Sequence, residues 1–318
     1  MIYNNILEKI GNTPLVKIKL SGFDNINFYA KLEYYNPMGS VKDRAASYII
    51  KKGLDSGRIN KDTILIESSS GNFGIALSAY CKEYGLKFYC IVDPNISPTN
   101  EYLIKTLSTK MIKVTEIDEN RGYLLNRIRK VKELQKEIPN SYWINQYENP
   151  YNAEAYKETL GKEICDDMNN IDYVFLGVSS GGTITGMSQK VKEIFPNTKI
   201  IAVDIDGSVI FGGKSRKRFI PGIGSSMVPS ILKEAKIDEV FITNEISTIE
   251  MCHELLREHC LFLGGSSGSV YSAVKKYFKG KLFNKRQNVV AIFVDSGDRY
   301  INTIYNDNWC DNFLKEKL

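Results

Sequence analysis

Histidine is scarce in this chain of 318 residues, which contains only His253 and His259. The two stand six residues apart in one helical stretch, EMCHELLREHC, and therefore face different sides of a helix. Metal-binding pairs on helices use spacings such as i, i+4, so these histidines do not predict a metal site. If the chain is an enzyme, we expect a carboxylate, a tyrosine or a lysine to carry its proton transfers.

Paired cysteines, long apolar runs and one-sided charge are missing as well. The six cysteines form no C-x-x-C pair, which argues against a zinc site and a disulfide framework. No stretch approaches the ~20 apolar residues of a membrane span, and the first residues do not resemble a signal peptide. The net charge of +5 comes from scattered residues, so no nucleic-acid surface is predicted. We expect a cytoplasmic protein with no membrane or nucleic-acid partner.

Short apolar runs rich in β-branched residues alternate with helical patterns along the chain. The runs predict strands at residues 28–33, 63–69, 87–93, 110–117, 141–146, 173–179, 198–204, 239–243 and 288–296. Their alternation with helices predicts an α/β fold with largely parallel sheets that are covered on both faces. Such sheets bind ligands at the carboxyl ends of their strands. The best linker candidate is the Asn/Pro-rich stretch at residues 148–152.

The stretch NPMGSVKDR, residues 36–44, leads from a loop into a predicted helix. Ser40 and Asp43 fit a capping box in which the serine is the N-cap. This interpretation leaves Lys42 unexplained. An exposed Lys42 would be an ordinary residue of the first helical turn, whereas burial would lower its pKa and free its amine for Schiff-base chemistry.

Three more loops follow predicted strands. The serine loop, SSSGN at residues 68–72, opens a helix whose free N–H groups favour an anion such as a carboxylate, but it fits a simple capped turn equally well. The glycine loop, SSGGT at residues 179–183, matches neither a Walker loop nor a dinucleotide fingerprint and predicts a site for a single phosphate. In FVDSGDRY, residues 293–300, a strand ends in a serine. With Lys42, these loops together fit pyridoxal phosphate, which needs a Schiff-base lysine, a phosphate anchor and a partner for its ring nitrogen.

The motifs IGNTPLV, NPMGSVKDR, SSSGNFG, SSGGT, PGIG, GGSSGS and SGDRY follow one another along nearly the whole chain. In these motifs the chain resembles the fold-type II pyridoxal-phosphate enzymes of the cysteine synthase and cystathionine β-synthase family. The resemblance implies a homodimer and two three-layer αβα domains with the coenzyme in the cleft between them. Residues 1–38 and 147–318 would form the larger, coenzyme-anchoring domain. Residues 39–146 would form a smaller, mobile domain that carries the loop for the substrate carboxylate.

The resemblance also implies a role for each residue that matches a family motif. Lys42 would form the internal aldimine with pyridoxal 5'-phosphate, and Ser296 would face the ring nitrogen, while Asp298 is expected to cap the next helix. Asn72 would bond the ring hydroxyl. The phosphate would be held by Ser179, Ser180, Gly181, Gly182 and Thr183. The substrate carboxylate would be bound by Ser69, Ser70, Asn72 and Gln146. No metal is implied.

Four further stretches, CIVDPNISPTN, GYLLNRIRKVKEL, YWINQY and GSVIFG, resemble a subgroup of siderophore-pathway enzymes. Those enzymes make N-(2-amino-2-carboxyethyl)-L-glutamate from O-phosphoserine and glutamate. Arg127, Tyr147 and Ser179 are candidates for recognising O-phosphoserine or the acceptor carboxylates, although Arg127 equally fits a solvated arginine on an amphipathic helix. Arg218 is a weaker anion-binding candidate. Departures at residues 180–182 and in ENPYNAEAYKE, which reads more like a cysteine synthase, leave the acceptor open.

A neutral serine at the ring nitrogen favours expulsion of a β-substituent over transamination. We therefore expect a ping-pong β-replacement through an α-aminoacrylate, with Lys42 moving the α-proton. The first choice of substrates is O-phospho-L-serine and L-glutamate. The alternative is cysteine synthesis, or consumption of cysteine with release of hydrogen sulfide and formation of lanthionine or serine. Dehydratase-type β-elimination ranks third, and a non-enzymatic binding protein last.

Overall fold

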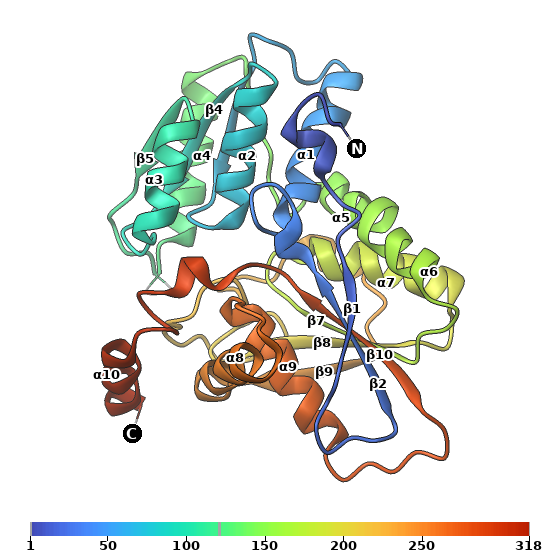
Figure 1. The fold of residues 1–318 in the computed structure, drawn as a ribbon. Coiled ribbons are helices and arrows are strands. Elements are labelled where there is room, and N and C mark those ends of the chain that lie inside the picture. Colours follow the sequence, from blue (N-terminus) through green and yellow to red (C-terminus); the bar gives the residue numbers. More distant parts are fainter. Residues whose placement is uncertain (1, 120–121, 318) are drawn as a thin grey trace.

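The computed structural model describes residues 2–119 and 122–317 and shows an α/β fold built on two sheets (Figure 1). The larger sheet has the strand order β1-β2-β10-β7-β8-β9 and the smaller one β5-β4-β3-β6. The larger contains β1 (Leu15–Ile18), β2 (Ile26–Leu32), β7 (Tyr173–Gly177), β8 (Lys199–Ile205), β9 (Glu239–Thr243) and β10 (Gln287–Phe293). The smaller contains β3 (Ile64–Ser68), β4 (Lys87–Val92), β5 (Lys110–Lys113) and β6 (Ser141–Trp143).

Parallel pairing dominates both sheets, as the alternation of strands and helices predicts. The described strands pair in parallel except β1, which runs antiparallel to β2 with Leu15 opposite Lys31. Strand β1 is the one strand missing from the prediction. It has only four residues, lies at the edge of the sheet and buries none of its side chains fully, so it lacks the apolar run that identifies the other strands.

Helices cover the sheets and connect their strands. They are α1 (Lys42–Asp55), α2 (Asn72–Glu83), α3 (Pro98–Leu107), α4 (Leu124–Glu137), α5 (Pro150–Tyr156), α6 (Lys162–Asp167), α7 (Gly182–Ile194), α8 (Glu245–His259), α9 (Gly265–Phe278) and α10 (Asp307–Lys317). Short 3-10 segments are η1 (Ile6–Lys9), η2 (Glu33–Tyr35), η4 (Ser230–Glu234) and η5 (Gly297–Tyr300), and η3 (Lys157–Gly161) is a π-helical segment. No helix in the described part of the chain is both long and apolar enough to cross a membrane.

The central strands of the larger sheet, β10, β7 and β8, are buried on both faces. Val174 and Leu176 of β7 pack in the same cluster as Ile184 of α7, whereas the intervening Phe175 packs with Tyr271 of α9. The first of these clusters also reaches α1 and α2 beside the smaller sheet. The two sheets therefore share a continuous hydrophobic core, with α1 between α2 and α5 (Figure 1).

The predicted linker at residues 148–152 is wrong, because this stretch starts a helix. The Asn149 side chain accepts a hydrogen bond from the Tyr151 N–H at 3.1 Å, and Pro150 occupies the first helical position of α5. Asparagine before proline is a strong helix start as well as a turn signal. The domain boundaries at residues 38/39 and 146/147 remain a prediction; all of β3 to β6 lies between them and the other strands lie outside.

Candidate active site

The carboxyl ends of three strands and the start of α1 meet at one place. Strand β3 leads into the serine loop, β7 into the glycine loop, and β10 into Asp295 and Ser296. The Lys42 amine lies 3.4 Å from the Ser180 hydroxyl, and the Asn72 amide donates to Asp295 at 2.8 Å. Four segments far apart in the sequence thus form one site.

The turn before Lys42 forms one of the two hydrogen bonds of a capping box, the one from the Ser40 N–H to the Asp43 carboxylate. The Asp43 carboxylate accepts hydrogen bonds from the Ser40 N–H at 3.2 Å and from the Met38 N–H at 2.7 Å. The Ser40 hydroxyl, however, accepts from the Lys42 N–H at 3.2 Å, and α1 begins only at Lys42. Tyr80 donates a short hydrogen bond to Asp43. Burial raises the pKa of Asp43 to about 6, although these hydrogen bonds oppose the shift.

Lys42 itself is half-buried, and its amine is desolvated. Burial lowers the pKa of this amine to about 8, while the nearby Asp295 carboxylate acts in the opposite direction. A lysine with this pKa has a substantial unprotonated fraction near neutral pH, which is the form that attacks a carbonyl. The environment is therefore suited to Schiff-base chemistry rather than to a solvated first-turn lysine.

In the serine loop, the side chains hold the loop and leave backbone groups free. The Ser69 hydroxyl accepts from the Gly74 N–H at 3.0 Å, and the Ser70 hydroxyl donates to Asp93 at 2.8 Å. Helix α2 begins at Asn72, and an α-helix leaves its first N–H groups without partners. The N–H groups of Asn72 and Phe73 are thus available to a carboxylate at the positive end of the helix.

Arg127 braces this loop from α4. Its guanidinium donates to the Ser70 hydroxyl at 2.9 Å and pairs with Asp93 at 3.0 Å. The Arg127 side chain is only 12% exposed. The structure therefore contradicts the reading of Arg127 as a solvated arginine, and its charge is balanced by Asp93.

The glycine loop has the backbone freedom that a close phosphate contact requires. Gly181 has φ +84°, a left-handed conformation that favours glycine, and it immediately precedes α7. A Cβ on Gly182 would lie 2.4 Å from the side chain of Asn152, so this position also demands glycine. The Ser179 hydroxyl donates to the Gly224 carbonyl at 3.2 Å, and Thr183 contacts the buried Tyr156 hydroxyl.

Gln146 connects the serine loop with the glycine loop. Its backbone N–H donates to the buried Glu67 at 3.2 Å, and its carbonyl accepts from Asn152 at 2.6 Å. Burial raises the pKa of Glu67 to about 7, with backbone hydrogen bonds opposing it. Glu67 and Asn152 are absent from the predicted site. An acid that ends an apolar strand run, as in ILIE, is the signal that would have identified Glu67.

At the end of β10 the structure changes the expected roles. The Ser296 hydroxyl donates to Asp298 at 2.7 Å and also caps η5 by accepting from the Asp298 N–H. The expectation that Asp298 is the cap is therefore wrong, because the exposed Asp298 lies inside the turn that Ser296 caps. The role of Ser296 at the ring nitrogen stays a prediction, and it requires that hydroxyl to leave Asp298.

Asp295 is the main residue that sequence reasoning missed. It is fully buried, and its Oδ2 accepts from Asn72 at 2.8 Å and from the Tyr300 hydroxyl at 3.0 Å. Its Oδ1 is buried without a hydrogen-bond partner among the described residues. Burial raises the pKa of Asp295, while the Arg299 charge and these hydrogen bonds lower it. Arg299 also donates to Asn72 and to the Met38 carbonyl.

The two remaining predicted substrate residues are Arg218, which precedes the PGIG loop at residues 221–224, and Tyr147, which contacts η4. The Arg218 guanidinium donates to the Gly207 carbonyl at 2.5 Å and to the Ser226 hydroxyl at 3.1 Å. The Tyr147 carbonyl accepts from the Ile231 N–H at 3.3 Å. Burial raises the pKa of the Tyr147 hydroxyl to about 12, the charge of Glu67 also raises it, and the charges of Arg127 and Arg218 lower it.

These residues fit pyridoxal phosphate. The amine of Lys42 is desolvated, and the glycine loop begins α7 with Gly182, where a Cβ would clash with Asn152. The buried Asp295 Oδ1 has no hydrogen-bond donor among the described residues. Lys42, Asn72 and the glycine loop would hold the aldehyde, the ring hydroxyl and the phosphate. The residues present thus fit the aldehyde, the ring hydroxyl and the phosphate of the coenzyme, while the partner of the ring nitrogen stays the predicted role of Ser296.

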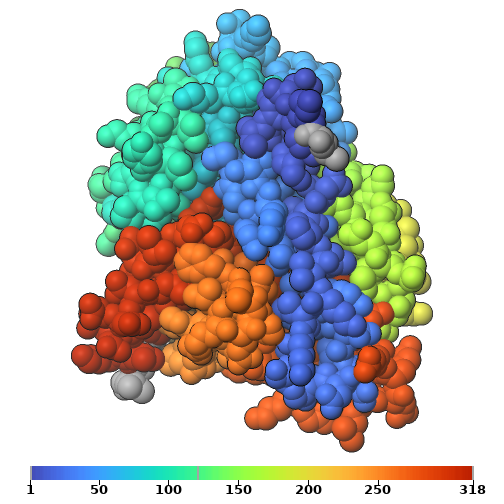
Figure 2. Space-filling view, viewed as in Figure 1, coloured from blue at the N-terminus to red at the C-terminus, as the bar shows by residue number. Residues whose placement is uncertain are grey.

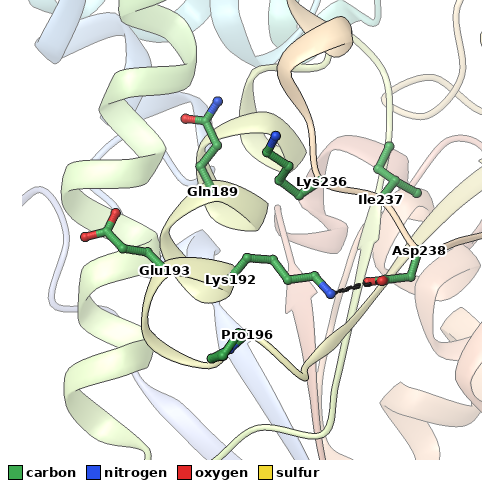
Figure 3. Close-up of a pocket in the computed structure, with 7 residues that line it drawn as sticks. All are labelled: Gln189, Lys192, Glu193, Pro196, Lys236, Ile237 and Asp238. Atoms are coloured by element: carbon green, nitrogen blue, oxygen red, sulfur yellow. Dashed lines mark hydrogen bonds and ion pairs between the residues drawn. The ribbon is translucent and has the colours of Figure 1, made fainter.

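An open surface pocket of about 540 Å³ lies away from this site (Figure 3). It is at the carboxyl end of α7, next to Pro196, whereas the glycine loop is at the amino end. Helix α7 has 13 residues, so its ends are roughly 20 Å apart. Lys192 points across the pocket to Asp238, with which it pairs at 2.9 Å (Figure 3). Its lining includes none of the residues predicted to hold the coenzyme or the substrate.

Comparisons with known proteins agree with this geometry. A crystal structure of O-acetylserine dependent cystathionine beta-synthase from Helicobacter pylori is 32% identical, with a TM-score of 0.89 over 96% of this chain and 100% of that one. A hydrogen sulfide-producing enzyme from Fusobacterium nucleatum is 30% identical, with a TM-score of 0.88 over 94% and 100% of the two chains. O-ureido-L-serine synthase is 25% identical, with a TM-score of 0.87 over 99% and 100%. The model of the pyridoxal-phosphate dependent enzyme family matches residues 6–295, and the chain belongs to this family.

Proposed function

We propose that the enzyme catalyses β-replacement on an activated serine, and that its substrates are O-phospho-L-serine and L-glutamate. The products are N-(2-amino-2-carboxyethyl)-L-glutamate and inorganic phosphate. The amine of glutamate forms a bond to the β-carbon, and the bond from that carbon to the phosphate oxygen breaks. Four sequence stretches shared with the siderophore-pathway subgroup support this choice of substrates.

The observation that carries the β-replacement is the state of the Lys42 amine. It lies beside Ser180, between the serine loop and the glycine loop, and burial lowers its pKa to about 8. Pyridoxal phosphate, once bound, withdraws electrons from the substrate α-carbon and so makes the α-proton acidic. Lys42 is the base that can take this proton and return it, because both histidines lie in α8, outside the loops that form the site.

The other residues orient the substrate. We assign the α-carboxylate to the serine loop, where the N–H groups of Asn72 and Phe73 have no partner among the described residues, with Gln146 bonded to Glu67 just before that loop. Ser69 and Ser70 then act mainly by holding the loop, since their hydroxyls are already bonded within it. The glycine loop would hold the coenzyme phosphate, and Lys42 would move the substrate α-proton.

Sulfur chemistry at the same carbon is the second candidate, and the relatives favour it. Cystathionine carries a sulfur substituent on the β-carbon of an alanyl group, and the Fusobacterium nucleatum relative is a hydrogen sulfide-producing enzyme. The stretch ENPYNAEAYKE points the same way. The enzyme would then use O-acetylserine or cysteine as donor and sulfide or cysteine as acceptor. Simple β-elimination to a 2-oxo acid is the third candidate.

A donor–acceptor matrix tests these proposals. The coenzyme-loaded enzyme is incubated with O-phosphoserine, O-acetylserine, serine or cysteine, each with glutamate, sulfide, cysteine or no acceptor. Mass spectrometry identifies the products, and phosphate, sulfide and 2-oxo acid are measured separately. We expect O-phosphoserine and glutamate to give one phosphate for each N-(2-amino-2-carboxyethyl)-L-glutamate formed. If glutamate is never incorporated and sulfide or cysteine is, the second candidate replaces the first.

The family resemblance also supports a homodimer, and the composition supports a cytoplasmic location. Both belong to the proposal. Light scattering of the purified enzyme tests the first, and a mass of one chain, 36.0 kDa, would contradict it.

A further inference from the structure

The side-chain amide of Asn72 is held at both ends by charged residues. Its Nδ2 donates to the Asp295 carboxylate at 2.8 Å, and its Oδ1 accepts from the Arg299 guanidinium. A carboxylate ion only accepts hydrogen bonds, and a guanidinium only donates them. The amide therefore has one orientation that satisfies both neighbours, with its oxygen toward Arg299 and its nitrogen toward Asp295.

The Asp295 carboxylate is itself fixed by its surroundings. It is fully buried, and the Oδ2 that accepts from Asn72 also accepts from the Tyr300 hydroxyl at 3.0 Å. The Asp295 carbonyl accepts from the Gly264 N–H at 3.1 Å. A Cβ on Gly264 would lie 2.1 Å from the Asp295 Oδ1, so the carboxylate packs directly against this glycine. The protein alone thus determines where Asp295 presents its acceptor to Asn72.

Arg299 extends the same network to the turn before Lys42. Its guanidinium also donates to the Met38 carbonyl, in the loop that leads into α1. In that loop Ser40 forms an antiparallel backbone bridge with Asp295. The residues that follow β10 thus hold both the amide and the turn before Lys42. In Figure 2 the carboxyl-terminal part of the chain (red) adjoins the surface of the smaller sheet's segment (teal).

These two contacts limit what the Asn72 side chain can offer a ligand. An asparagine amide has two N–H donors on one side and an acceptor oxygen on the other. Asp295 uses one N–H, and the oxygen is turned to Arg299, so the second N–H is the group left for the coenzyme. A ring oxygen that meets a donor is favoured in its ionised form, because hydrogen bonds to a charged group stabilise that group.

We propose that Asp295 and Arg299 are positioning residues, which orient the Asn72 amide so that it donates to the ring oxygen of pyridoxal phosphate and keeps that oxygen ionised. Both act through Asn72 and not by contact with the coenzyme. The proposal rests on the role of Asn72 at the ring hydroxyl, and it does not depend on which substrates the enzyme uses.

The absorbance of the coenzyme-loaded enzyme without substrate tests this proposal. Pyridoxal phosphate bound to a lysine absorbs at longer wavelength when its ring oxygen is ionised than when that oxygen is protonated. The ratio of the two bands is measured at neutral pH. We expect Asp295→Ala and Arg299→Ala each to lower the ratio of the ionised to the protonated form about 10- to 100-fold. Each variant frees the Asn72 amide to turn, so the ring oxygen loses a hydrogen bond that stabilises its charge.

The direction of the change in Asp295→Ala separates positioning from charge. Loss of a nearby negative charge would by itself favour the ionised ring oxygen, so a through-space effect predicts a higher ratio for Asp295→Ala and a lower one for Arg299→Ala. Asp295→Asn and Arg299→Gln remove the charges but keep an acceptor and a donor for the amide, so their ratios should stay close to that of the wild type. Arg216→Ala is the matched control, since Arg216 is exposed and pairs with Asp206 at 3.0 Å, and it should leave the ratio unchanged.

Binding of 3-deoxypyridoxal phosphate, which lacks the ring oxygen, shows whether each variant keeps its fold. Fluorescence titration should find this binding retained. A ratio that rises or stays unchanged in an Asp295→Ala enzyme that binds the analogue overturns the proposal. If Asp295→Ala does not bind the analogue, the arginine variants decide instead, and a ratio as low in Arg299→Gln as in Arg299→Ala overturns it.

A second background separates this proposal from its premise and from the reaction. In Asn72→Ala the ratio should already be low, and adding Asp295→Ala should lower it no further, because no amide is left to orient. An unchanged ratio in Asn72→Ala alone would remove Asn72 from the ring oxygen and overturn the proposal at its premise. If the donor–acceptor matrix shows no incorporation of glutamate while the ratio depends on Asp295 and Arg299 as expected, the positioning role stands and the choice of glutamate falls.

Discussion

Replacing Arg44 with methionine is expected to destabilise the start of α1. The Arg44 side chain is fully buried, and its guanidinium bonds Glu33 at 2.6 and 2.9 Å and Glu163 at 2.6 and 2.8 Å. Methionine would leave Glu33, which is also fully buried, with only Thr13 and Asn36 as partners. Removal of one partner from a buried ion pair costs about 3–5 kcal/mol. That is a large part of the roughly 5–15 kcal/mol by which native proteins are stable.

Urea unfolding of the coenzyme-loaded enzyme, followed by circular dichroism, measures this loss. Arg129→Ala is the matched control, because Arg129 pairs with Glu119 at 2.7 Å with both side chains more than half exposed, and such pairs contribute about 0.2–1 kcal/mol. The double variant Arg44→Met/Glu33→Leu should recover part of the loss, since it removes the uncompensated carboxylate. A loss for Arg44→Met no larger than that for Arg129→Ala would refute the reasoning.

Three further predictions follow from pKa shifts and close packing. Burial raises the pKa of Glu163, but hydrogen bonds and charges from Arg44 and Lys31 outweigh burial and lower the pKa to about 2. The ionised Glu163 therefore stabilises the folded protein fully above pH 4.5, its ordinary pKa, and this contribution is lost as the pH falls toward 2. Glu163→Gln should therefore be less stable than wild type in urea at neutral pH, and the difference should shrink over that acid range. When pyridoxal phosphate is added to the apoenzyme, the rate at which the absorbance of the bound coenzyme appears should rise with pH through about 8, as Lys42 loses its proton. Asp295→Asn should move the midpoint of this rise to lower pH, because the Asp295 charge raises the Lys42 pKa. A rate that does not depend on pH contradicts the assignment of Lys42. Gly182→Ala places a Cβ 2.4 Å from Asn152 and should weaken coenzyme binding about 5- to 150-fold in a fluorescence titration, whereas Gly182→Ala/Asn152→Ala should regain part of it.

Much of the fold could be predicted because its signals are local. Each of the nine predicted strands overlaps an observed strand, and the chain belongs to the family that its motifs resemble. Several predictions ran too far at the carboxyl end, as at residues 141–146, where β6 ends at Trp143. The extra residues there, Ile144 to Gln146, turn out of the strand to contact Glu67 and Ile66. Residues that leave a strand to line a site keep the apolar pattern of the strand and so extend the prediction.

The site was harder to predict from the sequence than the fold, because the role of each residue depends on which way its side chain points. Asp295 and Ser296 are neighbours in sequence, and only the backbone pairing of Asp295 with Ser40 and of Ser296 with Leu263 decides which side chain faces Asn72. Since successive residues of extended chain point to opposite sides, a motif match alone cannot tell them apart. Arg127 is a similar case. Its partner Asp93 is 34 residues away in the sequence, so only the tertiary structure shows that the Arg127 charge is balanced.

The sequence by itself determined the alternation of strands and helices, the four loops at their ends, and the presence of a lysine with almost no histidine to compete with it. These features depend on residue type and on neighbours within a few positions. Only the tertiary structure decided that the Lys42 amine is desolvated beside Ser180, 138 residues away, and that Asn72 bonds Asp295, 223 residues away. Burial and electrostatics sum over all atoms nearby in space, whatever their separation along the chain, so they determine pKa values and free donors only after folding is complete.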